Sequence, residues 1–152
     1  MSSIARVPLS TDRPWLWISA LAIILALVAG VGPVSSTILH HIVQTLPLWI
    51  PIAFRRRAWA SWFALPCFLF WLFIMVAIWM FLLHLPTFVN GHFSPVEIAM
   101  TIVCGIASVA GIVAALKTRA VPLGTAVALF FAGAAAEFAC FWISRIDFIW
   151  HH

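Results

Sequence analysis

Three consecutive arginines, Arg55, Arg56 and Arg57, constrain this chain more than any other feature. They interrupt a stretch, residues 15–96, that otherwise contains no aspartate, glutamate, lysine or arginine. Placing one arginine at the centre of a bilayer costs about 2.5–3.5 kcal/mol on insertion scales. The three side chains must therefore lie in water or among lipid headgroups, and the chain must leave the membrane at this point.

Composition indicates that the apolar stretches are membrane segments rather than the core of a soluble protein. Hydrophobic residues make up 65% of the 152 residues, charged residues make up 8%, and the mean hydropathy is +1.15. Such a chain has too few polar residues to cover a soluble globule. The net charge of +4 does not indicate nucleic-acid binding, because the basic residues lie at segment ends and form no continuous basic face. We expect an all-α integral membrane protein without a soluble catalytic domain.

Breaker residues and the three arginines divide the chain into five apolar segments, which we expect to form a single transmembrane domain with short loops. The expected spans are residues 14–32, 36–54, 58–85, 95–116 and 121–144. Ser94 and Glu97 have the spacing of a capping box at the start of the fourth span. The first span resembles a secretory signal peptide, because Arg6 and Arg13 precede it, but its apolar run is long enough to remain in the membrane.

The second segment is ambiguous, because it contains His40, His41 and Gln44 and two prolines that predict a kinked helix. It either spans the membrane or lies flat at its surface. If it spans, seven basic residues share one side and Arg145 lies on the other: Arg6, Arg13, Arg55, Arg56, Arg57, Lys117 and Arg119. If it does not span, the same residues divide five against three. The positive-inside tendency favours a five-helix bundle with the N-terminus cytoplasmic and the C-terminus outside.

Small residues recur at four-residue intervals in the last two spans. They are Ala107, Gly111 and Ala115 in one span, and Ala128, Ala132 and Ala136 in the other. Small residues let membrane helices approach closely. We therefore expect the fourth and fifth helices to pack against each other as a hairpin.

The five-span arrangement places most polar side chains in the outer half of the bundle. His40, His41 and Gln44 share one stripe of the second helix, and His84 follows the outer end of the third. Glu137 lies inside the last helix, where an ionisable residue is a functional candidate by default. We expect Glu137 to point into the bundle and to form a hydrogen bond with His40 or His41, directly or through one water.

Three functional classes remain. The first is an accessory or anchor subunit of a larger membrane complex, with other subunits or further copies of this chain as partners. The second is an outer-side haem b or metal-binding subunit with His40 or His41 and His84 as ligands, since imidazoles from two helices can hold a haem iron from both sides. The third is a small proton-linked transporter or channel that uses Glu137. We expect no catalytic activity from the chain alone, and a location in a bacterial inner (plasma) membrane.

The cysteines give no sign of a metal site. Each lies alone within a separate apolar segment, and their spacing matches no metal-binding motif. They are Cys67, Cys104 and Cys140. We interpret them as small core residues.

Overall fold

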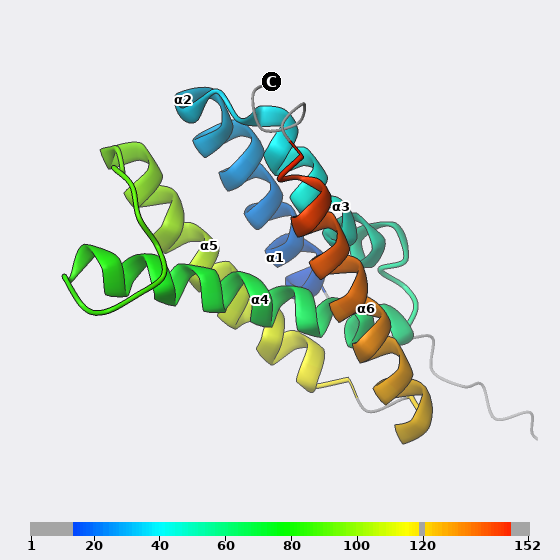
Figure 1. The fold of residues 1–152 in the computed structure, drawn as a ribbon. Coiled ribbons are helices and arrows are strands. Elements are labelled where there is room, and N and C mark those ends of the chain that lie inside the picture. Colours follow the sequence, from blue (N-terminus) through cyan, green and yellow to red (C-terminus); the bar gives the residue numbers. More distant parts are fainter. Residues whose placement is uncertain (1–13, 119–120, 147–152) are drawn as a thin grey trace, which may run out of the picture.

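The computed structural model describes residues 14–118 and 121–146, and all regular secondary structure in them is helical. Five helical segments follow one another along the chain (Figure 1). The first combines α1 (Pro14–Leu25), the π-helical turn η1 (Ala26–Val31) and α2 (Gly32–Ser35); the others are α3 (Ile38–Ala53), α4 (Trp59–Leu82), α5 (Pro95–Leu116) and α6 (Leu123–Ile143). Some residues used in the charge count and in the polar pattern lie outside the described residues: Arg6, Arg13, Arg119 and the residues after Ile146.

Four of these segments are long and apolar enough to cross a membrane: Pro14–Ser35, Trp59–Leu82, Pro95–Leu116 and Leu123–Ile143. The protein is therefore a small polytopic membrane protein whose apolar spans contact lipid. The remaining helix, α3, has 16 residues, or about 24 Å at 1.5 Å per residue. That is shorter than a typical hydrocarbon core of about 30 Å.

A tight turn reverses the chain between α2 and α3. Ser36 ends α2 in the left-handed conformation with φ of 55°, and Thr37 precedes the first residue of α3. Gly32 lies under this turn, where a Cβ atom would come within 3.0 Å of the Cα atom of Ile38. Glycine at this position therefore favours the close approach of the two helices, because a larger residue would crowd the backbone of Ile38.

Helix α3 returns along α1 and ends beside its beginning. The guanidinium carbon of Arg55, just after α3, lies 5.7 Å from the ring centroid of Trp17 in the first turn of α1. Pro47 and Pro51 are both accommodated inside α3, and both are buried. The two helices thus run antiparallel over much of their length (Figure 1).

Helix α4 is the centre of the packing, and the predicted hairpin of the last two helices is wrong. Among the described residues, α5 and α6 form no extensive interface with each other, and each packs on α4 instead (Figure 1). A Cβ atom on Gly111 of α5 would lie 2.6 Å from the ring of Phe68 in α4. A Cβ atom on Gly133 of α6 would meet the carbonyl group of Phe63 and lie 2.9 Å from Pro66, also in α4.

The small residues of α5 are buried as expected, whereas the stripe chosen on α6 is not the buried one. Ala128 and Ala132 are exposed. The buried face of α6 consists of Ala126, Gly133 and Glu137. Glu137 therefore points into the bundle, as the sequence analysis predicts.

The two ends of the bundle differ in their residues. At one end, the imidazole Nδ1 of His40 lies 2.8 Å from the carbonyl oxygen of Ser144, which joins the start of α3 to the end of α6. Ser35, Thr37 and Glu97 line a common cavity there, so the α2–α3 turn and the start of α5 meet at the same end. We call this the histidine end. The opposite end, where residues 55–57 lie beside the start of α1, is the arginine end.

Candidate functional site

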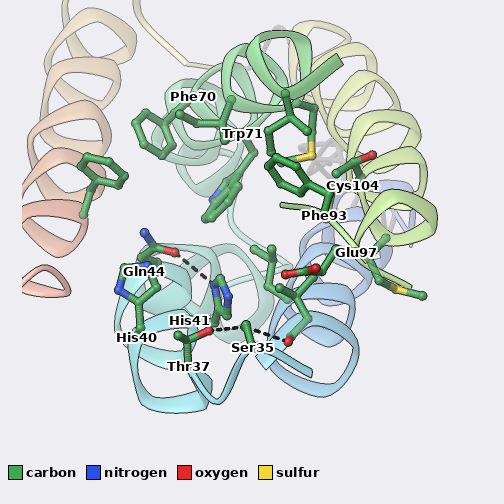
Figure 2. A pocket seen from close by; sticks show the side chains of 18 residues that line it. Ser35, Thr37, His40, His41, Gln44, Phe70, Trp71, Phe93, Glu97 and Cys104 are labelled. Carbon is green, nitrogen blue, oxygen red and sulfur yellow. Dashed lines mark hydrogen bonds between the residues drawn. The ribbon is translucent and has the colours of Figure 1, made fainter. Parts of the chain in front are cut away.

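A cavity of about 440 Å³ lies at the histidine end and is partly open to the surroundings (Figure 2). Every helical segment of the bundle contributes to its wall, and Phe93 from the segment before α5 completes it. The polar lining residues are Ser35, Thr37, His40, His41, Gln44, Glu97 and Thr101. The cavity therefore gathers three of the residues singled out in the sequence, His40, His41 and Gln44.

The α2–α3 turn and the first turn of α3 form the polar wall of the cavity. His41 Nδ1 lies 3.2 Å from Gln44 Oε1, and Ser35 Oγ lies 2.6 Å from Thr37 Oγ1 (Figure 2). Ser35 Oγ also donates to the carbonyl oxygen of Val31 at 3.0 Å. Since residues three or four apart share a helix face, the His41 and Gln44 pair follows directly from the helical period.

His40 has a different role from His41, although the two are neighbours. The residue is 6% exposed, and its Nδ1–H donates to the carbonyl oxygen of Ser144, just after α6. The two imidazole rings meet edge to face, with centroids 5.1 Å apart. His40 therefore ties α3 to α6 and supports the orientation of His41 in the cavity.

Glu97 completes the capping box that the sequence predicts, and it also lies in the cavity wall. Its backbone N–H donates to Ser94 Oγ at 3.2 Å, and the Ser94 backbone N–H donates to Glu97 Oε2 at 2.7 Å. The same carboxylate is close enough to His41 to interact with it electrostatically. The local sequence predicts only the capping role of Glu97, because nothing in it indicates that the start of α5 faces the start of α3.

Aromatic and sulfur-containing side chains form the apolar walls. Phe70 and Trp71 of α4 meet edge to face at 5.7 Å, and Phe70 meets Phe141 of α6 at 5.3 Å. Met75 and Met100 line the wall nearer to α5. The sequence did not indicate these residues, because α4 and the facing parts of α5 and α6 are apolar, and their patterns do not show which face is buried.

Glu137 is buried between α4 and α6 and does not line the cavity. It is 2% exposed, and neither carboxyl oxygen has a hydrogen-bond partner of ordinary geometry in the described part of the chain. The Cys67 thiol and the Trp71 indole N–H lie close enough to interact with the carboxyl group. The direct form of the predicted hydrogen bond to His40 or His41 is therefore wrong, and its form through one water stays a prediction. Trp71, which lies beside Glu137, also lines the cavity.

His84 does not lie in the cavity with His40 and His41. It follows α4 with φ of 59°, is exposed, and is absent from the cavity lining. Among residues 14–118 and 121–146, no group of three histidine, cysteine, aspartate or glutamate side chains is arranged to hold a metal ion. The histidine end thus offers His40 and His41 from a single helix.

No protein-family model, curated protein or solved structure matches this chain. Its function must therefore be argued from the geometry of the chain itself.

Proposed function

We propose that this protein is a five-span protein of a bacterial inner membrane that binds an amphipathic small molecule in the cavity at its histidine end. The observation that carries the proposal is the division of the cavity into a polar wall and apolar aromatic walls inside a lipid-embedded bundle. Ligand sites commonly have a volume of about 300–1,000 Å³, a mostly apolar lining and a few convergent polar groups. The cavity of about 440 Å³ fits that description.

A second, wider groove supports access from the bilayer. The groove has a volume of about 750 Å³ and lies between α4 and α5. It is lined almost entirely by apolar side chains such as Trp79 and Ile106. Met75 and Thr101 line both the groove and the cavity. A lipid-soluble molecule lying in the groove would be separated from the cavity by these two side chains.

The antiparallel course of α1 and α3 supports the five-span topology. Because Arg55 lies beside Trp17, α3 covers the distance from the histidine end to the arginine end despite its 16 residues. This course puts the three consecutive arginines on the same side as the start of α1. The charge bias then favours a cytoplasmic arginine end and an external histidine end.

A cavity-filling substitution tests the binding function. Ile78 lines the cavity and is only partly buried, so Ile78→Trp should fill cavity volume without disrupting the fully buried core. Ile143→Trp is the matched control, because Ile143 is 47% exposed and lies outside the cavity. Native mass spectrometry after extraction into lipid nanodiscs should show a bound small molecule on the wild type and the control, but not on Ile78→Trp. An unchanged bound mass on Ile78→Trp would contradict the proposal.

A second role, as accessory or anchor subunit of a larger complex or as a homo-oligomer, is favoured by α6. Gly124, Ala128 and Ala132 are exposed on this helix, and nothing lies within 4 Å of a Cβ atom built on Gly124. Exposed small residues allow a second helix to approach closely. Ala132→Leu should then abolish co-purification of a partner in mild detergent without lowering the melting temperature. Retention of every co-purifying protein would count against this role.

The haem and proton-transport alternatives have less support from the geometry. His40 and His41 are neighbours on one helix and cannot approach a haem iron from opposite faces, and His84 lies outside the cavity. A reduced-minus-oxidised spectrum of the gently purified protein tests for haem b directly. A proton-linked role of Glu137 would require proton access through the packing around Trp71.

A further inference from the structure

We propose that the ligand of this cavity is a protonated amine that carries an apolar body. The inference rests on the proposed binding function and specifies the chemical class of the molecule. Three independent properties of the lining support it: the sign of its charge, its pattern of hydrogen-bond donors and acceptors, and its aromatic content.

The cavity lining includes an acidic side chain, Glu97. Among the described residues of the cavity wall, Glu97 is the only aspartate, glutamate, lysine or arginine. Arg145 packs over Phe141, with its guanidinium carbon 5.2 Å from the ring centroid, but it is exposed and is not part of the lining. A carboxylate in the wall attracts a cation and repels an anion. An amphipathic cation is therefore favoured over a fatty acid or another anionic lipid.

The polar wall offers several acceptor atoms, together with the amide N–H donors of Gln44. Gln44 Oε1 can only accept, so His41 Nδ1 carries the proton of their hydrogen bond. A ring with this single proton has Nε2 as an acceptor, whereas the Gln44 amide nitrogen remains a donor. Ser35 donates its hydroxyl proton to the Val31 carbonyl group, so Thr37 donates to Ser35 in their 2.6 Å contact. Both hydroxyl protons are thus used in hydrogen bonds within the turn, and the hydroxyl oxygens keep lone pairs that can accept a hydrogen bond from a ligand.

Glu97 adds further acceptor capacity to the same wall. One of its carboxylate oxygens accepts the Ser94 backbone N–H, and an ionised carboxylate has about four lone-pair sites in all. The first turns of α3 and α5 therefore present a carboxylate, an imidazole nitrogen and hydroxyl oxygens to the cavity (Figure 2). A group with several N–H donors and a positive charge, an ammonium group, complements this set.

The remaining walls suit the rest of such a molecule. Phe70, Trp71, Phe93 and Phe141 surround the cavity, and aromatic faces attract organic cations within about 6 Å. Aliphatic and methionine side chains from η1, α4 and α5 provide the surface for an apolar body. A neutral amphiphile would gain the apolar contacts but not the charge attraction of Glu97.

The test compares two probes that differ only in their polar group, 6-phenylhexylamine and 6-phenylhexanol. Their binding is measured by calorimetry on the full-length protein in nanodiscs of zwitterionic lipid, with empty nanodiscs subtracted. The amine should bind the wild type about tenfold more tightly than the alcohol. Glu97→Gln should remove this preference and leave the affinity for the alcohol unchanged. Because glutamine also serves in a capping box, this variant keeps the cap of α5.

Ser94→Ala distinguishes the effect of the Glu97 charge from the effect of the helix cap, because it weakens the capping box and keeps the carboxylate. The preference for the amine should survive in this variant. Equal binding of amine and alcohol to the wild type, or a preference that persists in Glu97→Gln or disappears in Ser94→Ala, would overturn the inference about ligand class. If the inference about ligand class fails but Ile78→Trp still prevents binding of both probes, the proposed binding function stands. If neither probe binds saturably, or Ile78→Trp leaves their binding unchanged, the binding function and the ligand class both fail.

Discussion

Gly133 is the most sensitive position that the packing of α4 against α6 creates. A Cβ atom added there would overlap the backbone carbonyl group of Phe63 and lie 2.9 Å from a ring carbon of Pro66 and 3.0 Å from the carbonyl carbon of Phe63. Atoms of a helical backbone cannot rotate away as a side chain can. Gly133→Ala must therefore push α6 away from α4 along their contact.

The expected size of the effect follows from two opposing contributions. Replacing glycine by alanine inside a helix stabilises it by about 0.5–1 kcal/mol. Overpacking a close contact typically costs about 1–3 kcal/mol, and the upper part of that range applies here because the neighbour is backbone. We expect Gly133→Ala to lower the free energy of unfolding by about 1–2 kcal/mol.

Two other glycines provide matched controls for the same substitution. Nothing lies within 4 Å of a Cβ atom built on Gly105 in α5, so Gly105→Ala should leave stability unchanged or raise it by about 0.5–1 kcal/mol. At Gly111 the new atom would lie 2.6 Å from the fully buried ring of Phe68. Gly111→Ala should destabilise the protein, but less than Gly133→Ala, because a ring can shift more easily than a carbonyl group.

The assay is thermal unfolding in mild detergent, followed by tryptophan fluorescence and circular dichroism on all three variants. The expected order of melting temperatures is Gly105→Ala highest, Gly111→Ala intermediate and Gly133→Ala lowest. A melting temperature of Gly133→Ala equal to or above that of Gly105→Ala would refute the close contact between α4 and α6.

Reporter enzymes test the topology: a fusion after Arg57 should be active in the cytoplasm and one after His152 outside, and a cytoplasmic signal at His152 would contradict five spans. Ser94→Ala should lower the free energy of unfolding by about 1 kcal/mol in a denaturant titration, whereas unchanged unfolding would mean that the capping box does not stabilise α5. Glu137→Leu should leave the melting temperature unchanged or raise it, because it removes a buried carboxyl group whose oxygens have no hydrogen bond of ordinary geometry; a clear decrease would reveal a stabilising partner. Glu137→Gln and His41→Gln should have additive effects on stability within about 0.5 kcal/mol, since the two side chains are not hydrogen-bonded; a larger coupling would restore the pairing that the sequence suggested.

The class of the protein and the positions of its helices could be predicted from sequence, because both depend on local properties. Length and hydropathy indicate segments that only a bilayer can solvate. The start of α5 follows from Ser94 and Glu97, whose hydrogen bonds join residues three positions apart. The contact between His41 and Gln44 likewise follows from the helical period.

The arrangement of the helices and the cavity between them were decided only by the tertiary structure. In α6, the exposed Ala128 and Ala132 and the buried Gly133 are all small and apolar, so composition does not distinguish the lipid-facing side from the packed side. The contact of Gly133 with α4 depends on the shape of the backbone around Phe63.

Glu97 and Trp71 became cavity residues for the same reason, since each acquires its neighbours from a distant part of the chain. A soluble protein shows its buried face by the contrast between apolar and polar residues. In a bilayer the solvent is as apolar as the interior, and helix association depends on the fit between surfaces. Hydropathy therefore located the helices of this protein, while only steric complementarity determined which of them pack together and where they leave a cavity.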